Sequence, residues 1–548
     1  MRKLSLGTGA LVGALLTAAL IGVMYLGQQL AGLPFVPYEL FNWVARELPG
    51  SLITFGIDLM IDTMLFLNIS VVDAAKTAER VQALGLFLAG GTVAGAIYFA
   101  VMKIRGARAD LFSGLLMGAL FGLPMIAVSL IISQTTINPI IHFLWLALLF
   151  LGWGIALSRV YGRLEDISQA AQAATVENEV EARSVERIGR RKFLIRLGAT
   201  TAAITVVSGG IGAVLATAER RRQEEALEGT MAHSAEEGTS SPFPNANDPV
   251  VPVPGTRPEY TPIKDHYKVF LQTEPTVIDG TMWQLPITGL VENPLLLSID
   301  DIRANYEPRD QYVTITCISG RVGTGLIGTT QWTGVSLQEI LTDAGVQDEA
   351  RYLVIESGDG FYETVDLDLV AADERIMLCY EWDGNALPVD HGYPLRIWIP
   401  DRYGMKQPKW ITSMELVDEY VDGYWVERNW DKEAQVKATS VIDTVAVDHI
   451  IENGSEQLVP IGGIAYAGAR GISKVEVRVD GGPWEAAQLR SPLSETTWVL
   501  WRYEWPFAAG DHLFEVRTAE ADGTPQIEVT QKSRPDGASG IHSEEATL

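Results

Sequence analysis

Tyr-Val-Thr-Ile-Thr-Cys occupies residues 312–317, and the glycine-rich segment Ile-Ser-Gly-Arg-Val-Gly-Thr-Gly follows over residues 318–325. The alternating β-branched residues of the first segment predict a strand. The glycines of the second segment allow the backbone to approach a ligand closely. The stretch therefore predicts a strand that delivers Cys317 to an open loop, where a thiolate suits a soft metal ion. The alternative is a small, buried apolar cysteine.

The residues around this stretch predict a domain of the α+β class. Short β-runs separated by turn residues begin beyond Ile263, and Ser336 is placed to cap a helix. Cys379 is the second of two cysteines, so at most one disulfide is possible. It precedes Tyr380 on a predicted strand, where neighbouring side chains point to opposite faces. We therefore expect Cys379 in the core.

Further motifs follow Cys317 in order. They are Trp-Thr-Gly-Val at 332–335, Tyr-Glu-Trp-Asp-Gly at 380–384, His-Gly-Tyr-Pro-Leu-Arg at 391–396, Arg-Tyr-Gly-Met-Lys at 402–406, Lys-Trp at 409–410 and Gly-Tyr-Trp at 423–425. Several motifs at consistent spacing are more specific than any one of them. With Thr-Cys-Ile-Ser-Gly-Arg at 316–321, they resemble the sulfite oxidase family of molybdopterin-dependent oxidoreductases over roughly residues 263–540.

The resemblance implies a molybdenum–molybdopterin cofactor and residues that hold it. Cys317 would supply the protein sulfur to molybdenum, and Tyr380 matches the active-site tyrosine of the family. His391 and Arg396 match residues that hold the pterin and its phosphate, where a guanidinium can bind two oxygens at once. The alternatives are a half-buried sheet tyrosine at position 380 and a turn residue at position 391.

Basic residues complete the implied site. Lys406 and Lys409 lie where the family places cations that line the cofactor and anion pocket. Arg321 and Lys406 would favour an oxyanion, and with Cys317 and Tyr380 they form the expected catalytic set. Asp359, which precedes a glycine, predicts a turn near the cofactor.

Two positions depart from the family pattern. Sulfite oxidases follow the cysteine with two adjacent arginines, but here the pair is Arg321-Val322, and Lys406 replaces another family arginine. A dianion such as sulfite needs several positive donors, each worth about 1.5–3 kcal/mol. Oxidation of sulfite to sulfate, with electrons passed to a separate carrier, is still the expected reaction. The alternatives are an S-oxide or N-oxide reductase and a non-catalytic protein that binds an oxyanion.

The first 217 residues contain long stretches that are nearly free of charge. Five can cross a bilayer, which takes about 20 residues; they lie at roughly 4–26, 83–102, 111–132, 139–158 and 198–217. Basic flanking residues predict that the N-terminus lies inside and that the catalytic domain is extracytoplasmic, in a multi-pass protein of the cytoplasmic membrane. The segment 52–72, which contains Asp58 and Asp62, is expected to be an interfacial helix.

A single histidine, His142, lies in or near a span, so a membrane haem with two histidine ligands is not expected. Arg190-Arg191 followed by Phe193-Leu194 and an apolar segment resembles a twin-arginine export signal, which serves proteins that are already folded. Ordinary juxtamembrane positive charge is the alternative. The following residues up to 262 are charged and then rich in Ser, Pro, Asn and Gly, a composition that predicts a flexible linker.

Evenly spaced short strands in the last hundred residues predict an immunoglobulin-like sandwich. They are expected at 438–447, 458–465, 472–479, 497–505 and 512–518. The resemblance implies that this sandwich makes a homodimer contact.

The predicted organisation therefore combines an α-helical transmembrane bundle, an α+β molybdopterin-binding domain and an all-β sandwich. The parts are a membrane domain (1–164), a cytoplasmic helix with the twin-arginine motif and fifth span (165–217), a linker (218–262), the catalytic domain (263–432), the dimerisation domain (433–540) and a tail (541–548).

Charge is distributed unevenly along the chain. Residues 218–548 hold 26 basic and 55 acidic residues, a net charge of −29. Such a surface repels nucleic acid and attracts a basic protein partner. Because no haem or iron–sulfur motif occurs in the sequence, electrons require a separate carrier, and a c-type cytochrome fits the acidic surface.

Overall fold

The computed structural model describes residues 4–548 apart from short gaps, and the chain divides into two compact units. One unit is formed by Met1–Leu48 with Ala75–Ala226, and the other by Pro49–Ala74 with Leu227–Leu548. The residues outside the description are 1–3, 51, 53–54, 57–58, 61–62, 65–70, 107, 134–136, 174–178 and 236–242.

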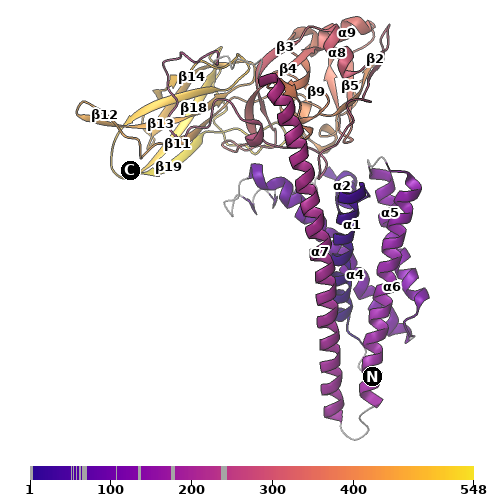
Figure 1. The fold of residues 1–548 in the computed structure, drawn as a ribbon. Coiled ribbons are helices and arrows are strands. Elements are labelled where there is room, and N and C mark those ends of the chain that lie inside the picture. The colour runs from indigo at the N-terminus through magenta and orange to yellow at the C-terminus, as the bar shows by residue number, and fades with distance from the viewer. Residues whose placement is uncertain are drawn as a thin grey trace. The chain divides into compact units, whose positions relative to one another are not determined.

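The first unit consists of helices (Figure 1). They are α1 (Leu6–Ala31), α2 (Val36–Glu47), α4 (Val71–Arg105), α5 (Leu111–Ile132), α6 (Pro139–Ala173) and α7 (Glu179–Ala235). Five apolar helices among the described residues are long enough to cross a membrane, within Leu6–Ala31, Lys76–Arg105, Leu111–Ile132, Pro139–Ala170 and Arg187–Ala218. The five predicted apolar spans coincide with these helices, which are compatible with a membrane-anchored protein.

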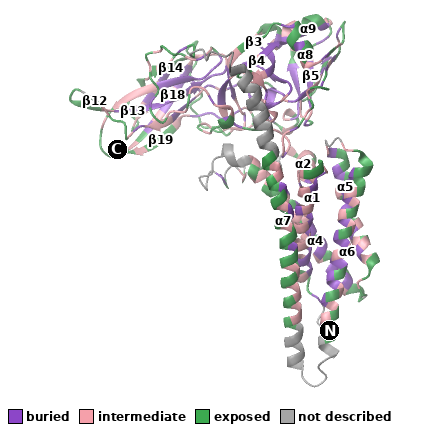
Figure 2. Cartoon of the chain, in the orientation of Figure 1, coloured by how far each residue is buried: buried purple, intermediate pink, exposed green. Residues whose placement is uncertain are grey.

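Many residues of these helices are exposed (green in Figure 2), and large apolar residues are among them. Leu120, Ile131, Leu148 and Val206 are 62–78 % exposed. Exposed apolar surface of this extent is unfavourable in water, at about 25 cal/mol per Å², and is accommodated by lipid. The inner faces pack around Phe87, which is 1 % exposed.

Glycines bring α1 and α4 into close contact. A Cβ atom on Gly95 would lie 2.5 Å from the carbonyl oxygen of Gly9 and 2.7 Å from the Cα atom of Gly13. The obstructing atoms belong to the backbone and cannot rotate away. Small residues at helix contacts allow membrane helices to approach closely, and these glycines serve that purpose.

α2, which follows α1 and contacts α5, was not predicted. Pro37 lies in its first turn, a position that proline favours because the N–H there has no helical partner. The interfacial helix expected at 52–72 falls largely outside the described residues, as do Asp58 and Asp62.

The region between the helical bundle and the sheets differs from the prediction. α7 is continuous, so Arg190-Arg191, the fifth apolar span and the start of the expected linker share one helix. From Phe243 the chain packs against the sheets of the second unit, to which it belongs, and Arg257 pairs with Asp443 at 2.6 Å. A helix and packed chain therefore replace much of the flexible linker predicted over 218–262. Good helix formers after the span, mostly Glu, Arg, Gln and Ala, explain the helical part.

The second unit begins with one mixed sheet, one antiparallel sheet and three short helices (Figure 1). The first sheet has the order β2-β1-β10-β5-β6, and the second has the order β3-β4-β7-β8 with β9 paired to β7. Leu285, Ile355 and Ile397 belong to the core that both sheets share. The bounds are β1 (Leu285–Gly289), β2 (Leu295–Leu297), α8 (Ile299–Asn305), β3 (Arg309–Thr316), β4 (Ile327–Ser336), α9 (Leu337–Ala344), β5 (Tyr352–Ser357), β6 (Tyr362–Asp366), α10 (Leu367–Ala372), β7 (Met377–Trp382), β8 (Asn385–Ala386), β9 (Arg396–Trp398) and β10 (Ile411–Val417).

Two more sheets form the C-terminal part, drawn in yellow in Figure 1. One has the order β11-β13-β17-β16 with β12 on β13, and the other has the order β15-β14-β18-β19. Ile461, Trp501 and Phe514 belong to their common core. The five predicted strands are confirmed as β11, β13, β14, β17 and β18. The bounds are β11 (Thr439–Val445), β12 (Ile451–Asn453), β13 (Glu456–Tyr466), β14 (Ile472–Val479), β15 (Glu485–Ala486), β16 (Gln488–Leu489), β17 (Val499–Pro506), β18 (Asp511–Glu520) and β19 (His542–Thr547).

Gly95→Ala is expected to lower the free energy of unfolding of the membrane unit by about 1–3 kcal/mol, because the added methyl group overpacks the α1–α4 contact. Gly85→Ala in the same helix is the matched control, since no atom lies within 4 Å of a Cβ there. The control should be neutral or stabilising by up to about 1 kcal/mol. Thermal unfolding in detergent measures both, and equal melting temperatures would contradict the α1–α4 contact.

Candidate functional site

Cys317 lies immediately after β3, at the start of the loop that connects β3 to β4. The last strand pair is Thr316 with Ile327, and the Cys317 N–H donates to the carbonyl of Leu326 at 2.9 Å. The Sγ atom lies 3.1 Å from the Ser319 hydroxyl, and the residue is half-buried. The strand and the open loop predicted around Cys317 are thus both present.

A small cavity of about 50 Å³ adjoins Cys317. Apolar side chains, including Val322, Val441 and Ile464, form part of its lining, and Tyr403 also borders it. Three cations line it as well, namely Arg257, Arg321 and Lys437. The cavity lies between the Cys317 loop and the first strands of the C-terminal part, so residues from both parts border the thiol.

Arg396 carries a guanidinium into the interior on the same side as Cys317. β9 pairs with β7 so that Arg396 is opposite Cys379, and Cys379 and Cys317 belong to one packed cluster. The guanidinium lies 4.2 Å from the centre of the Trp332 ring and donates to the carbonyl of His391 at 3.1 Å. Arg396 is 4 % exposed and forms no ion pair among the described residues. Burial lowers its pKa to about 10.

Two buried histidines accompany Arg396. The rings of His266 and His391 are 5.4 Å apart, and both rings lie within 5 Å of the Trp382 ring. Burial lowers the pKa of His266 to about 3 and the pKa of His391 well below its usual value, with smaller contributions from Arg396 and Lys409. Both imidazoles are therefore neutral at physiological pH.

The polar atoms of this group fit a large anionic ligand. The Nε2 atoms of His266 and His391 and the Nε atom of Arg396 are buried and have no hydrogen-bond partner among the described residues. An unpaired buried polar group costs about 1–3 kcal/mol, and an unpaired charge costs more. His266 donates its Nδ1–H to the Tyr267 carbonyl at 3.2 Å, so its Nε2 atom accepts, whereas the Arg396 Nε–H donates. A ligand with phosphate oxygens and ring N–H groups would satisfy both kinds of atom, and the nearby thiol of Cys317 is suited to a soft metal ion.

Lys409 lies near the two histidines, and Asp359 occupies a turn. The Lys409 ammonium donates to the carbonyl of Val269 at 2.9 Å and lies 4.6 Å from the Trp410 ring centre. Lys409 also opposes the effect of burial, which raises the pKa of the Cys317 thiol. The Asp359 carboxylate accepts the N–H of Phe361 at 3.0 Å, as expected for the predicted turn.

Lys406 differs from its expected position. Its ammonium forms a buried ion pair with Glu363 at 2.6 Å and donates to the carbonyl of Thr364 at 2.8 Å. Glu363 is fully buried, and burial raises its pKa while Lys406 opposes that shift. The charge of Lys406 is therefore neutralised within the fold. The sequence could not indicate this, because Glu363 is 43 residues away in the chain.

The structure does not bring Tyr380 to Cys317. Tyr380 belongs to the core between the two sheets, where the Arg303 guanidinium lies 4.9 Å from its ring centre. Neighbouring residues on β7 alternate faces as predicted, but Cys379 is the one on the face of Cys317. Arg321 is exposed at the rim of the cavity.

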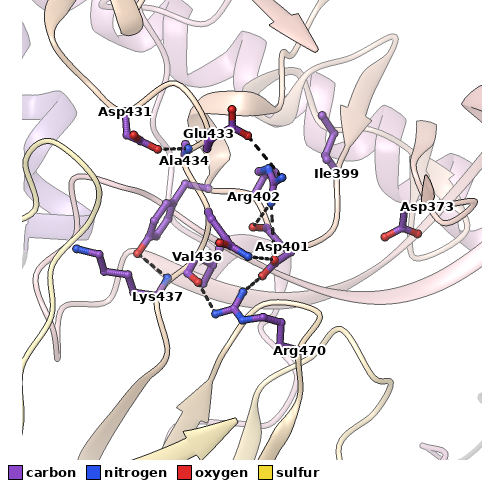
Figure 3. A network of polar contacts seen from close by, with 12 residues as sticks. Asp373, Ile399, Asp401, Arg402, Asp431, Glu433, Ala434, Val436, Lys437 and Arg470 are labelled. Carbon is purple, nitrogen blue, oxygen red and sulfur yellow. Dashed lines mark hydrogen bonds and ion pairs between the residues drawn. The ribbon is translucent and has the colours of Figure 1, made fainter. Parts of the chain in front are cut away.

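Tyr403, which sequence reasoning missed, borders the cavity and donates its N–H to the carbonyl of Ala434 at 2.9 Å. Figure 3 shows the polar network that contains Asp401, Val436 and Arg470. Arg470 donates to the Asp401 carboxylate and, at 2.7 Å, to the carbonyl of Val436. The Tyr403 hydroxyl accepts the N–H of Lys437 at 3.2 Å. The motif Arg-Tyr-Gly-Met-Lys contained the signal, because Tyr403 occurs within it, but the contacts come from a distant part of the chain.

Comparison with known proteins adds independent evidence. Residues 272–425 match the family model described as the oxidoreductase molybdopterin binding domain. The uncharacterised oxidoreductase YuiH of Bacillus subtilis is 35% identical over 153 residues, which cover 28% of this chain and 73% of that protein.

Two further relatives are more distant. Mitochondrial sulfite oxidase of Macaca fascicularis is 27% identical over 277 residues, covering 42% of this chain and 51% of that protein. A putative protein-methionine-sulfoxide reductase subunit of Azospira oryzae, YedZ1, is 27% identical over 155 residues, covering 28% of this chain and 56% of that protein. The chain therefore spans about half the length of these two relatives.

The family match covers the residues that surround Cys317, His391 and Arg396, and their unpartnered polar atoms fit the implied group. The chain belongs to the sulfite oxidase family of molybdopterin-dependent oxidoreductases, and its cofactor is molybdenum–molybdopterin.

Proposed function

We propose that this protein is a membrane-anchored enzyme that transfers an oxygen atom to or from a small substrate at the extracytoplasmic face. The observation that carries the proposal is the placement of Cys317 in the packed cluster whose tryptophans contact Arg396 and His391. One half-buried thiol and several unpartnered buried nitrogen atoms thereby lie on one side of the β3-β4-β7 sheet.

Each residue of the site has a distinct role in this proposal. Cys317 holds molybdenum, and Arg396, His391 and His266 bind the phosphate and ring atoms of the pterin. Lys409 adds positive charge near both groups. When bound, the cofactor would supply oxygen-atom transfer to or from the substrate, coupled to two electrons received from or passed to a carrier. Tyr403 borders the cavity and can hydrogen-bond to a substrate oxygen there.

The charges around the cavity favour a substrate of low charge. Arg257 pairs with Asp443 at 2.6 Å, and Lys437 pairs with Asp536 at 2.9 Å. Lys406 pairs with Glu363 away from the cavity. Carboxylates thus neutralise cations that would otherwise attract a dianion. An S-oxide or N-oxide, which carries no net charge at its oxygen-bearing group, fits this environment best, and the enzyme then acts as a reductase.

Sulfite, the substrate expected from the sequence, is the second candidate. Arg321 lines the cavity and supplies one of the two adjacent arginines of the family pattern. Similarity to a protein named sulfite oxidase also supports this candidate.

The membrane arrangement belongs to the same proposal. We place the N-terminus inside and the catalytic unit outside, with Arg190-Arg191 as an export signal that suits a domain folded around its cofactor. The C-terminal sheets are proposed to be an immunoglobulin-like sandwich that makes a homodimer contact. The net charge of −29 in residues 218–548 supports a basic electron carrier, such as a c-type cytochrome.

Cys317→Ser is expected to abolish turnover and to lower the molybdenum content, because a hydroxyl is a poor ligand for a soft metal. Cys379→Ala is the matched control, since Cys379 is fully buried in the same cluster and has no assigned role in catalysis. The measurements are elemental analysis and reoxidation of a reduced viologen dye by substrate. A Cys317→Ser protein with unchanged turnover would exclude this site.

The substrate prediction is tested with the molybdenum-loaded wild-type protein. Methionine sulfoxide or trimethylamine N-oxide should be turned over with a higher kcat/KM than sulfite. Val322→Arg restores the second arginine and should raise kcat/KM for sulfite by about 10- to 100-fold, the effect of one charge-assisted hydrogen bond. Val346→Arg, on an exposed residue outside the cavity lining, is the control. Faster turnover of sulfite by the wild type would contradict the low-charge substrate.

A further inference from the structure

A chain of three hydrogen-bonded polar side chains occurs in the helical unit, and it joins two buried residues, Ser129 and His142, to the half-buried Glu39. The Ser129 hydroxyl on α5 donates to the carboxylate of Glu39 on α2. The same hydroxyl lies 2.7 Å from the Nε2 atom of His142 on α6. Ser129 is fully buried, and His142 is 3 % exposed. Three helices therefore contribute one side chain each to a continuous hydrogen-bonded chain.

These three side chains lie at one end of the helical bundle. Ser129 is in the last turn of α5, and His142 is in the first turn of α6. Glu39 is in the first turn of α2, which follows the C-terminal end of α1. Glu39 itself is outside the five apolar spans, whereas its two partners are inside them.

The surroundings of Glu39 disfavour its negative charge. α5 has no charged side chain, and α1 has none either, with Tyr25 as its titratable group. α2 also carries Tyr38, Arg46 and Glu47, and α6 contributes His142. Burial raises the pKa of Glu39 to about 7, although hydrogen bonds from Ser129 and Ser133 lower it.

The hydrogen bonds that join Glu39, Ser129 and His142 can run in two opposite directions. With an ionised carboxylate, the His142 Nε2–H donates to Ser129, and Ser129 donates to Glu39. With a protonated carboxyl, Glu39 donates to Ser129, and Ser129 donates to a deprotonated Nε2 atom. A hydroxyl both donates and accepts, so each direction uses the same three atoms. Proton transfer along the chain converts one direction into the other.

We propose that Glu39, Ser129 and His142 form a proton-transfer site at one end of the membrane bundle. The carboxyl proton of Glu39 passes to the Ser129 oxygen, while the hydroxyl proton of Ser129 passes to His142 Nε2. The step leaves a carboxylate and an imidazolium, and the reverse step restores the neutral pair. The ligand of this site is a proton. The site is independent of the reaction at Cys317, so failure of one assignment leaves the other standing.

A purely structural role would be to fix α2 against α5 through hydrogen bonds. Such a role affects stability, but it requires no exchange of a proton near neutral pH. Burial raises the Glu39 pKa in either role, so the roles are separated by whether substitution of His142 changes the pH dependence of carboxyl reactivity.

The test uses the full chain in lipid nanodiscs and dicyclohexylcarbodiimide, an apolar reagent that modifies protonated carboxyls in apolar surroundings. Mass spectrometry should find Glu39 modified below pH 7, with the yield falling as the pH rises through about 7. Glu39→Gln should abolish the modification, whereas Glu47→Gln, on an exposed residue of the same helix, should not. Absence of modification at every pH, or a midpoint in the ordinary carboxyl range, would overturn the proposal.

Two further variants test the relay itself. Ser129→Ala removes a hydrogen bond that lowers the pKa of Glu39, so the midpoint of modification should move to higher pH. His142→Asn does not alter Glu39 or Ser129, yet it should also shift the midpoint because the relay couples His142 to the carboxyl. Melting temperatures establish that each variant is folded. Where a variant does not fold, the wild-type profile and the Glu47→Gln control still decide. A folded His142→Asn protein with an unchanged midpoint would overturn the relay.

Discussion

The guanidinium of Arg396 is buried without a carboxylate partner among the described residues, and the arrangement around Cys317 depends on this charge. An unpaired buried charge costs several kcal/mol. The contact with the Trp332 ring face offsets about 2 kcal/mol of this cost, and the hydrogen bond to the His391 carbonyl offsets somewhat less of it. A bound anion would offset the rest of the cost of burying this charge. Binding of an anionic cofactor therefore stabilises the fold of this region, and the region is incomplete without it.

Charge is used differently on the two sides of Cys317. On the cofactor side, burial keeps His266 and His391 neutral, so they add hydrogen bonds without repelling Arg396. On the cavity side, Arg257 and Lys437 are each neutralised by an aspartate. Arg321 is the third cation that lines the cavity. In the proposed function, pairing of the other two cations disfavours a dianion, and shape and individual hydrogen bonds select the substrate.

Much of the fold could be predicted because its signals are local. Charge-free stretches located the five apolar helices, and β-branched alternation located the strand before Cys317. The site was predicted less completely. Alternation placed Cys379 and Tyr380 on opposite faces, but only the pairing of Cys379 with Arg396 shows which face adjoins Cys317. Lys406 was misplaced because its partner Glu363 is distant in sequence. Such pairings depend on strand register, which no local pattern contains.

The membrane unit illustrates the same limit in a second way. His142 lacks a second histidine, and by that criterion the sequence offers no function for it. In the fold, His142 and Glu39 both hydrogen-bond to Ser129. Ser129 is 13 positions before His142 in the chain, and Glu39 is 103 positions before it. The buried guanidinium of Arg396 has no carboxylate partner among the described residues, and an anionic ligand would neutralise its charge. Around Glu39 the hydrogen bonds close in both protonation states, so the group requires none. The two sites thus differ in whether the protein itself completes the hydrogen bonds of the ionisable group, and this difference underlies the two proposals.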